Sequence, residues 1–243
     1  EQWDGSSWTE VGDLNEGRVA GAGGGASGTD AIIAGGYELP NIGNSLKTET
    51  WNGSSWTEVN VLNAQKYTAG SGIPVSTSGI AFGGNPVVAT AEVWDGTNWT
   101  EVGDLNNARM YLGGFGNATS AIAANGVEPP HTQNKVEKWD GTSWTEVAEM
   151  NTARGEMLQG QGRTNESGII AGGSPNGSSQ ITNTEIWNGS SWSESNDLAT
   201  ARRMGGQIGP TSSGMYIGGQ TPSNVVTVEH WDSPLANKTI TAS

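Results

Sequence analysis

The sequence WDGTSWTEVAEMNTAR, residues 139–154, decides the fold because the chain repeats it in slightly altered form along its length. Each copy holds two tryptophans five residues apart, with an Asp-Gly or Asn-Gly step between them. Complete copies start at Trp3, Trp51, Trp94, Trp139 and Trp187, and a shortened copy, EHWDSP, contains Trp231. The copies start 43 to 48 residues apart, a period that, with several strands in each unit, indicates the blades of a propeller.

The two tryptophans of a copy predict a β-hairpin. In KTETWNGSSWTEV we expect strands at 48–51 and 56–59, because the Asn-Gly step between them suits a tight hairpin turn. Trp51 and Trp56 then lie opposite each other and project from the same face of the sheet. We expect such pairs to be buried against a neighbouring unit, which makes these tryptophans structural: Trp8, Trp51, Trp56, Trp94, Trp99, Trp139, Trp144, Trp187, Trp192 and Trp231.

Two further strands are expected in each unit. One is a short apolar run that ends in a glycine pair, as in AIIAGG at 31–36, with Asn125 replacing the first glycine in the third unit. The other precedes it and is rich in glycine, which strands tolerate where backbones approach closely, as around the axis of a small propeller. We therefore predict an all-β fold, a five-bladed β-propeller of four-stranded antiparallel blades, in a single domain spanning 1–243.

The two ends of the chain are incomplete in complementary ways. The first copy supplies only the third and fourth strands of a unit, and the last copy supplies only the first three. We expect residues 8–11 to join the C-terminal blade as its outer strand and so to close the ring. Such a closure would hide two sheet edges that otherwise invite association. The alternative is that residues 239–242 supply this outer strand.

The composition excludes several classes of site and partner. The chain has 243 residues, no cysteine and a formal net charge of −14, with only 11 lysines and arginines. Disulfides, thiolate metal sites and cysteine nucleophiles are therefore excluded. Nucleic acid is excluded as an expected partner, because binding to phosphates needs clustered positive charge. The sequence also contains no apolar run long enough for a membrane span.

Two sets of charged residues recur once in each unit. A glutamate lies two residues before the first tryptophan of a pair, and a basic residue closes each copy. A catalytic site is asymmetric, so we interpret these fivefold sets as architectural and expect the basic residues to contact carboxylates or strand-end carbonyls. The glutamates are Glu49, Glu92, Glu137, Glu185 and Glu229, and the basic residues are Arg18, Lys66, Arg109, Arg154 and Arg202.

The order of apolar strand, Gly-Gly, variable loop, Glu-x-aromatic, turn, Trp and Asn-x-Ala-Arg resembles the kelch repeat, with Trp where kelch repeats usually have Tyr. The resemblance covers essentially the whole chain. The WDGSSWTEV form also resembles the kelch-like repeats of bacteriophage virion and tail-fibre proteins and of bacterial surface proteins. Two other propeller repeats do not fit these residues. WD40 blades need a Gly-His pair, which the copies lack. The sialidase Asp-box needs a residue between Asp and Gly, which are adjacent here at Asp95-Gly96.

This resemblance implies a fold more than an activity, since kelch propellers include enzymes, binding modules and structural parts. We expect a non-enzymatic binding or structural module without a cofactor. Its expected setting is a phage virion appendage, such as a tail fibre for host attachment, or a bacterial extracellular surface. Expected partners are a glycan or protein receptor and other parts of a larger assembly. The alternatives are a carbohydrate-active enzyme of the glycoside hydrolase type and an intracellular protein-interaction scaffold.

Residues that differ between units are the candidates for binding. In a propeller, the loops before each first strand and after each second strand emerge on one face, around the mouth of the central channel. Aromatic side chains mixed with a few hydrogen-bonding groups suit a carbohydrate or a peptide. The candidates on these loops are Tyr37, Tyr67, Tyr111, His131, Glu156 and Arg203. The competing interpretation is that the loops vary without function and that Tyr67 or Tyr111 fills the channel.

A catalytic site is not expected from these residues. Glycosidases need two carboxyl groups at a set separation, whereas the inner strands and the loops before them offer Glu156 as a single central acid. Oxidases of the galactose-oxidase type need a cysteine cross-linked to tyrosine, and the chain has no cysteine. We expect His131 to be a loop residue and not a metal ligand.

Overall fold

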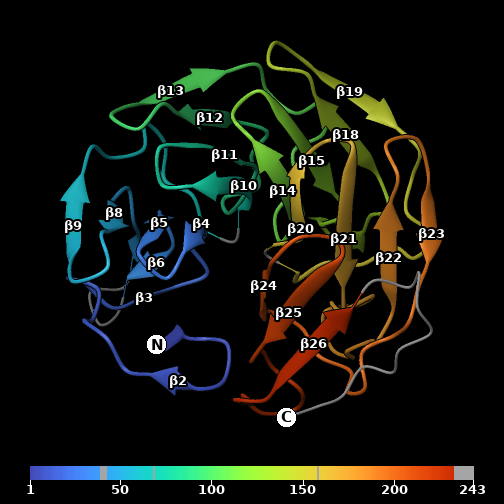
Figure 1. Cartoon of the computed structure of the whole chain (residues 1–243). Helices are drawn as coiled ribbons and strands as arrows, with labels where there is room; N and C mark the ends of the chain where they lie inside the picture. Colours follow the sequence, from blue (N-terminus) through green and yellow to red (C-terminus); the bar gives the residue numbers. More distant parts are fainter. Residues whose placement is uncertain (39–42, 68, 158, 233–243) are drawn as a thin grey trace.

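The structure is a computed structural model, which describes residues 1–38, 43–67, 69–157 and 159–232. The described residues form 26 β-strands and no helix. Five of the antiparallel sheets lie around a common centre, each with its first strand innermost and its last strand outermost (Figure 1). The expected all-β architecture of small antiparallel sheets is therefore confirmed.

Four of the five sheets have four strands, which pair in the order of the chain. Sheet 1 consists of β4 (Ala22–Ser27), β5 (Asp30–Ala34), β8 (Thr48–Trp51) and β9 (Trp56–Val59). Sheet 2 consists of β10 (Gly70–Val75), β11 (Ser78–Phe82), β12 (Ala91–Trp94) and β13 (Trp99–Val102). Sheet 3 consists of β14 (Gly113–Asn117), β15 (Ser120–Ala124), β18 (Val136–Trp139) and β19 (Trp144–Val147). Sheet 4 consists of β20 (Gln161–Thr164), β21 (Ser167–Ala171), β22 (Thr184–Trp187) and β23 (Trp192–Glu194).

Sheet 5 has three strands among the described residues, and the remaining strands are short. Sheet 5 consists of β24 (Gly206–Ile208), β25 (Ser213–Ile217) and β26 (Val228–Asp232). The short strands form an N-terminal hairpin of β1 (Gln2–Trp3) and β2 (Trp8–Thr9), a small sheet of β3 (Arg18–Val19), β6 (Tyr37–Glu38) and β7 (Gly43–Asn44), and a second hairpin of β16 (Val127–Glu128) and β17 (His131–Thr132).

Each hairpin between paired tryptophans is held by the residue that follows the first tryptophan. In sheet 1 the side-chain Oδ1 of Asn52 accepts hydrogen bonds from the backbone N–H groups of the two serines in the turn, at 2.9 and 3.0 Å. This turn places Trp51 directly opposite Trp56, with 5.5 Å between their ring centroids. The strands predicted at 48–51 and 56–59 are confirmed residue for residue.

The second tryptophan of a pair inserts between its own sheet and the preceding one. The indole N–H of Trp99 in sheet 2 donates to Oγ1 of Thr48 in sheet 1 at 2.9 Å. Trp144 of sheet 3 packs edge-on against Phe82 of sheet 2, with 5.1 Å between the ring centroids. Sheet 4 contacts sheet 3 in the same way. The indoles are therefore the contacts that join consecutive sheets.

Burial of the tryptophans follows their place in the chain. Those buried in the core are Trp51, Trp94, Trp99, Trp139, Trp144, Trp187, Trp192 and Trp231. Trp8 and Trp56 are only half-buried, which corrects the expectation that every pair is buried. The reason is that, among the described residues, no complete sheet precedes sheet 1 along the chain, so these two indoles lack the sheet wall that covers Trp99.

The inner strands approach one another too closely for side chains to fit between them. A Cβ atom on Gly24 in β4 would lie 2.0 Å from the carbonyl oxygen of Ile73 in β10. At Gly72 in β10, a Cβ atom would lie 3.0 Å from the backbone of Gly116 in β14. This close approach explains the glycine-rich segments, because only glycine permits it.

Every repeated glutamate is buried and pairs with the basic residue that precedes its own sheet. In sheet 3, Nη2 of Arg109 lies 2.8 Å from Oε1 of Glu137, and Nη1 donates to the carbonyls of Asn125 and Lys135 at 2.8 Å each. Oε2 of Glu137 accepts the backbone N–H of Asn106 at 2.6 Å. The expected contacts of the basic residues with carboxylates and strand-end carbonyls are confirmed.

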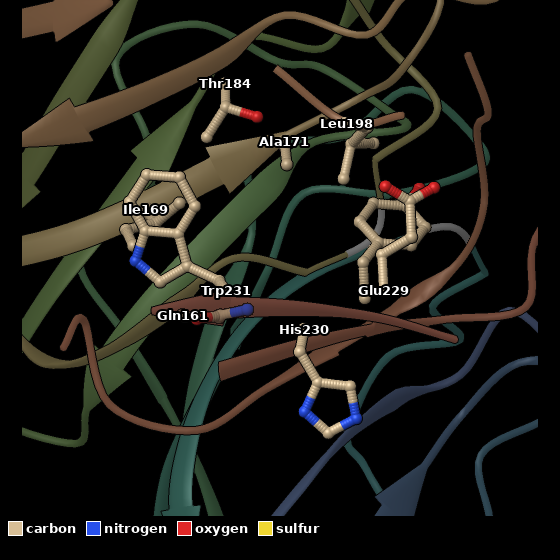
Figure 2. A pocket seen from close by; sticks show the side chains of 9 residues that line it. Gln161, Ile169, Ala171, Thr184, Leu198, Glu229, His230 and Trp231 are labelled. Carbon is tan, nitrogen blue, oxygen red and sulfur yellow. The ribbon is translucent and has the colours of Figure 1, made fainter. Parts of the chain in front are cut away.

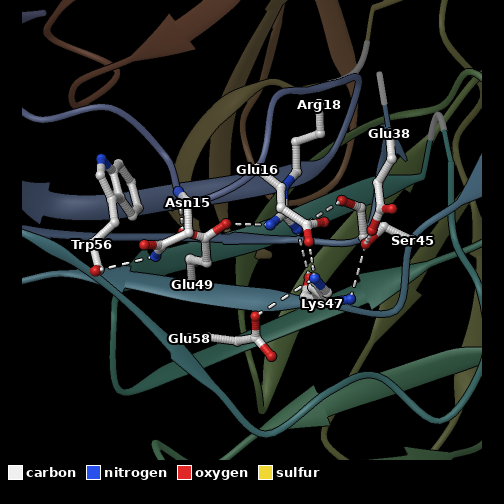
Figure 3. Close-up of polar contacts among 10 residues, drawn as sticks. Asn15, Glu16, Arg18, Glu38, Ser45, Lys47, Glu49, Trp56 and Glu58 are labelled. Carbon is white, nitrogen blue, oxygen red and sulfur yellow. Dashed lines mark hydrogen bonds and ion pairs between the residues drawn. The ribbon is translucent and has the colours of Figure 1, made fainter. Parts of the chain in front are cut away.

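Figure 3 shows the same arrangement in sheet 1, where Arg18 and the backbone of Asn15 both contact the carboxylate of Glu49. A second and more exposed cluster lies beside it, in which the ammonium of Lys47 contacts two further glutamates. Only the buried pair recurs in all five sheets, so it belongs to the architecture of the sheet.

The expected closure of the ring by residues 8–11 is wrong for the described residues. β2 pairs with β1 alone, and β26 pairs with β25 alone. The reason is local, because Oδ1 of Asp4 accepts the backbone N–H groups of Ser6 and Ser7 at 2.7 and 2.8 Å. This turn keeps β2 on its own partner, as the equivalent turns do in the other copies.

The N-terminal hairpin instead lies between sheets 1 and 5 as a separate unit (Figure 1). Its contact with sheet 5 is aromatic, with 6.1 Å between the ring centroids of Trp3 and His230. Residues 239–242, the alternative outer strand, lie outside the described residues.

The inserted indoles differ in whether their N–H group has an acceptor. The hydroxyl of Thr48, the first residue of β8, serves Trp99. The equivalent first residues of β12 and β18 are Ala91 and Val136, which have no acceptor. Accordingly, the buried N–H groups of the indoles packed beside them, those of Trp144 and Trp192, have no hydrogen-bond partner.

We predict opposite outcomes for two nearly isosteric changes at this position. Thr48→Val should lower the free energy of unfolding by about 1–3 kcal/mol, because it leaves the buried N–H of Trp99 without an acceptor. Val136→Thr should leave stability unchanged or raise it, because it supplies Trp192 with an acceptor, whereas a hydroxyl placed at a buried apolar site normally destabilises. Urea denaturation measures both effects, and equal losses would contradict the assignment.

A second prediction concerns the buried ion pair of sheet 3. Glu137→Gln should lower the free energy of unfolding by about 3–5 kcal/mol, because Arg109 then remains buried without its counter-charge. Glu101→Gln, on the exposed outer strand of sheet 2, is the control and should change stability by less than about 0.5 kcal/mol. Chemical denaturation checks both variants, and a small effect of Glu137→Gln would show that the pair is not structural.

Candidate functional site

One end of the five sheets is built by contacts between two kinds of loop. The segment that leads into each inner strand forms a short antiparallel bridge with the loop that follows the second strand of the same sheet. The bridge occurs at the equivalent place in all five sheets: Val19 with Tyr37, Tyr67 with Asn85, Met110 with Val127, Gly155 with Ser174, and Arg203 with Gln220. We call this end the loop face, and it carries the variable residues of both loops.

Five of the six predicted binding residues form an arc on the loop face. The rings of Tyr37 and Tyr67 lie 5.4 Å apart and are inclined by 46°. Tyr111 lies close enough to Tyr67 and Glu156 for both to affect its titration. Oε2 of Glu156 lies 2.5 Å from Nη1 of Arg203. All five residues are half-buried, so each combines a packed part with a part open to solvent.

The ion pair at the end of the arc is fixed by further acceptors. Nη1 of Arg203 also donates to the carbonyl of Gly177 at 2.6 Å, and Nε donates to Oε1 of Gln220 at 3.0 Å. The side chains of Arg203 and Glu156 are 16% and 12% exposed. The arc therefore ends in a charge pair whose orientation is set before any ligand arrives.

The surroundings of Tyr111 raise the pKa of its phenol. Burial raises the pKa of Tyr111 above its usual range, and the neighbouring Tyr67 and Glu156 raise it further. The positive charge of Arg203 opposes this rise. A neutral phenol can both donate and accept a hydrogen bond, which suits it to a ligand that carries hydroxyl groups.

The backbone of the loop face is strained at one repeated position. Ala20, Tyr111, Glu156 and Met204, each two residues after the basic residue of its sheet, have φ between 54° and 62°, a region that residues other than glycine rarely occupy. Backbone hydrogen bonds link these residues, from the N–H of Glu156 to the carbonyl of Tyr111 at 3.0 Å and from the N–H of Met204 to the carbonyl of Glu156 at 2.8 Å. Strain of this kind gathers at binding and catalytic sites.

Two glutamines that the sequence analysis missed bridge the inner strands beside the arc. Nε2 of Gln159 donates to the carbonyl of Gly23, which joins sheet 4 to sheet 1 across the centre. Nε2 of Gln207 donates to the carbonyls of Gln159 at 2.8 Å and Ala171 at 3.2 Å. The sequence feature that could have identified these glutamines is a long polar side chain within segments that are otherwise rich in glycine.

His131 lies apart from the arc. It is exposed on the hairpin of β16 and β17, and the described residues show no hydrogen bond or ring contact between its side chain and the other five candidates. The hairpin is anchored by Thr132, whose hydroxyl donates to the carbonyl of Pro175 at 2.7 Å. The structure therefore brings five of the six candidates together and leaves His131 separate.

Two further features concern the described residues as a whole. Within residues 1–38, 43–67, 69–157 and 159–232, no three His, Cys, Asp or Glu side chains lie together in a way that could hold a metal ion. The same part of the chain contains no helix of the length and apolarity that crossing a membrane requires.

Comparison with known proteins relates this chain by its fold and not by its sequence. No family model matches the chain, and no curated protein matches it either. Among the solved structures that match, the structure of YjhT has a TM-score of 0.78 and 15% sequence identity, covering 100% of this chain and 89% of that one. The fold is propeller-like. At this level of identity the similarity concerns architecture, so arguments about function rest on the site itself.

We predict that Glu156→Gln lowers the pKa of Tyr111. The change removes a negative charge beside the phenol and leaves Arg203 unpaired, so that both effects favour the phenolate. Ultraviolet titration of phenolate absorbance measures the shift, and a Tyr111→Phe variant identifies the transition by subtraction. Glu166→Gln, at an exposed glutamate outside the arc, is the control. An unchanged transition would mean that Glu156 and Tyr111 do not interact.

Proposed function

We propose that this chain is a non-enzymatic binding module whose loop face recognises a carbohydrate. The observation that carries the proposal is the arc, in which three tyrosines continue into a fixed ion pair on one face. Aromatic rings offer flat apolar surfaces on which the faces of sugar rings can stack, while a few oriented polar groups fix the hydroxyls. The half-buried ion pair and the neutral phenol of Tyr111 supply such groups.

The architecture that we propose is a kelch-like propeller with the five sheets as its blades. The recurrence of one buried glutamate and one basic residue in all five sheets supports this interpretation. The resemblance of the WDGSSWTEV repeats to those of phage virion and bacterial surface proteins supports a setting in a virion appendage or at an extracellular surface. In such a setting a carbohydrate on a cell surface is the ligand that the arc would meet, as in attachment to a host.

A glycoside hydrolase is the main alternative from another class. Such enzymes need two carboxyl groups about 5–10 Å apart, one on each side of the bond that breaks. On the arc the carboxylate is that of Glu156, and Arg203 pairs with it at 2.5 Å. A general acid is instead kept protonated by apolar surroundings. The pairing of Glu156 therefore favours binding over catalysis.

The test is a glycan-array screen of the purified chain, followed by calorimetric titration of the strongest ligand. Tyr67→Ala and Tyr111→Ala should each weaken binding roughly tenfold or more, the equivalent of about 1.4 kcal/mol. The melting temperature should stay nearly unchanged. Ser54→Ala, in the Trp51–Trp56 turn at the opposite end of sheet 1, is the control and should leave binding intact.

Two results would count against the proposal. If Ser54→Ala weakens binding as much as the tyrosine variants do, the ligand does not sit on the loop face. If the chain hydrolyses a glycoside and Glu156→Gln abolishes the reaction, the function is that of the alternative enzyme class.

A further inference from the structure

The carboxylate of Glu156 is held in place by its own main chain. The backbone N–H of Glu156 donates to the carbonyl of Tyr111 at 3.0 Å, and the carbonyl of Glu156 accepts the N–H of Met204 at 2.8 Å. Its φ of 62° confines the residue to the left-handed region that few residues other than glycine adopt. From this fixed backbone its Oε2 reaches Nη1 of Arg203 at 2.5 Å.

The guanidinium of Arg203 is held by two loops. Nη1 donates to Glu156 and to the carbonyl of Gly177 at 2.6 Å, and Nε donates to Oε1 of Gln220 at 3.0 Å. Gly177 lies in a turn in which Oδ1 of Asn176 accepts the backbone N–H groups of the two following serines. Within the described residues three of the five guanidinium N–H donors are therefore used, which leaves the two on Nη2 for the hydroxyls of a ligand.

Glu156 occupies the position that the charged group of an anionic ligand would take. Arginine binds anionic oxygens through paired N–H donors. A carboxylate or sulfate ester that approached Arg203 would have to displace Glu156, whose side chain is only 12% exposed. The displaced carboxylate would stay largely buried without its counter-charge, which is strongly unfavourable.

The basic residues beneath the arc are already neutralised. The five repeated ones are each paired with the buried glutamate of their own sheet. Arg202, the chain neighbour of Arg203, has its Nη2 at 2.6 Å from Oε1 of Glu229. Figure 2 shows Glu229 in the pocket between sheets 4 and 5, whose lining residues all lie outside the arc. Arg203 is therefore the cation that the described part of the arc offers, and it is paired.

The charge of the whole chain acts in the same direction. The formal net charge is −14, and a field of this sign repels anions at a distance, by an amount that salt reduces. The pairing of Arg203 with Glu156 removes the local attraction that could offset this repulsion.

We infer that Glu156 sets the specificity of the arc, which selects uncharged sugars and excludes those that carry a carboxylate or a sulfate ester. This inference rests on the proposed binding of carbohydrate at the loop face, to which it adds the class of carbohydrate. A neutral sugar can stack on the tyrosines while its hydroxyls accept from Nη2 of Arg203, and the ion pair stays intact.

The first test uses an array of matched pairs of oligosaccharides. Each pair consists of a neutral oligosaccharide and the same molecule with one hydroxyl sulfated or one hydroxymethyl group oxidised to a carboxylate. In calorimetric titrations at about 0.15 M salt, where long-range repulsion is screened, the wild-type chain should bind the neutral member about tenfold more tightly or better.

The outcomes of this test separate the two proposals. Equal or tighter binding of the charged members, weakened by Tyr67→Ala, would overturn the inference and leave the proposed carbohydrate binding intact. Binding of no oligosaccharide at all would overturn both. This comparison needs no variant at Glu156, so it decides the inference even if such a variant does not fold.

The second test uses matched glutamate variants. Glu156→Gln should raise the affinity for the charged members about tenfold or more, because Arg203 is then open to an anionic group. The double variant Glu156→Gln/Arg203→Gln should lose this gain. Glu166→Gln is the control, since it removes the same charge from an exposed glutamate that also pairs with a basic residue, Lys138, at 2.7 Å.

The control should keep the wild-type preference for neutral sugars. The inference is overturned if folded Glu156→Gln keeps that preference too, or if Glu166→Gln changes it as much as Glu156→Gln does. It is also overturned if the double variant retains the gain, because the charged group would then bind elsewhere than at Arg203.

Discussion

The indole inserted between one sheet and the next is the interaction on which the rest of the structure depends. A four-stranded sheet of this size has two faces to cover, and a tryptophan buries about 150–250 Å² in a single side chain. Trp99, Trp144 and Trp192 each serve one junction, and the aromatic rings of Phe82 and Phe115 meet two of them. The inner strands can then consist largely of glycine, because the apolar contacts between sheets are made farther from the centre.

The buried ion pairs have a different task from the indoles. Removing two charges from water costs nearly as much free energy as their mutual attraction provides. The five pairs therefore fix the positions of the segments that they join more than they raise the net stability. Each guanidinium or ammonium joins the segment entering a sheet to its third strand, and in sheet 3 Arg109 also holds the carbonyls of Asn125 and Lys135. The loop face lies directly beyond these contacts, which explains how variable loops can be held at a constant place.

The sequence predicted the parts of the fold that are determined locally. The Trp51–Trp56 hairpin could be assigned to the residue because the turn and the tryptophan spacing both lie within a few residues. The same locality explains the failed prediction of ring closure, since Asp4 holds β2 on β1 by the turn chemistry used in every other copy. Asn125 replaces the first glycine of the pair that ends the second strand of its unit. This replacement is possible because asparagine tolerates the left-handed conformation (φ 58°) better than most residues.

The candidate site was predictable in part for a related reason. The repeat fixes which loops share a face, and that was sufficient to bring Tyr37, Tyr67 and Tyr111 together. It does not reveal how far a loop extends from that face, so His131 was grouped with residues that it does not reach. The bridges of Gln159 and Gln207 depend on distances between different sheets, which no pattern within a single repeat contains.

The hydrogen bonds that link Tyr111, Glu156 and Met204 on the loop face are made by main-chain atoms alone. These hydrogen bonds therefore do not depend on which side chain each position carries, apart from the need to accept a positive φ. An amino acid at one of these positions can therefore be exchanged without removing these backbone hydrogen bonds. In evolutionary terms the surface can diversify one position at a time, so that related chains could acquire different ligands while keeping the same scaffold.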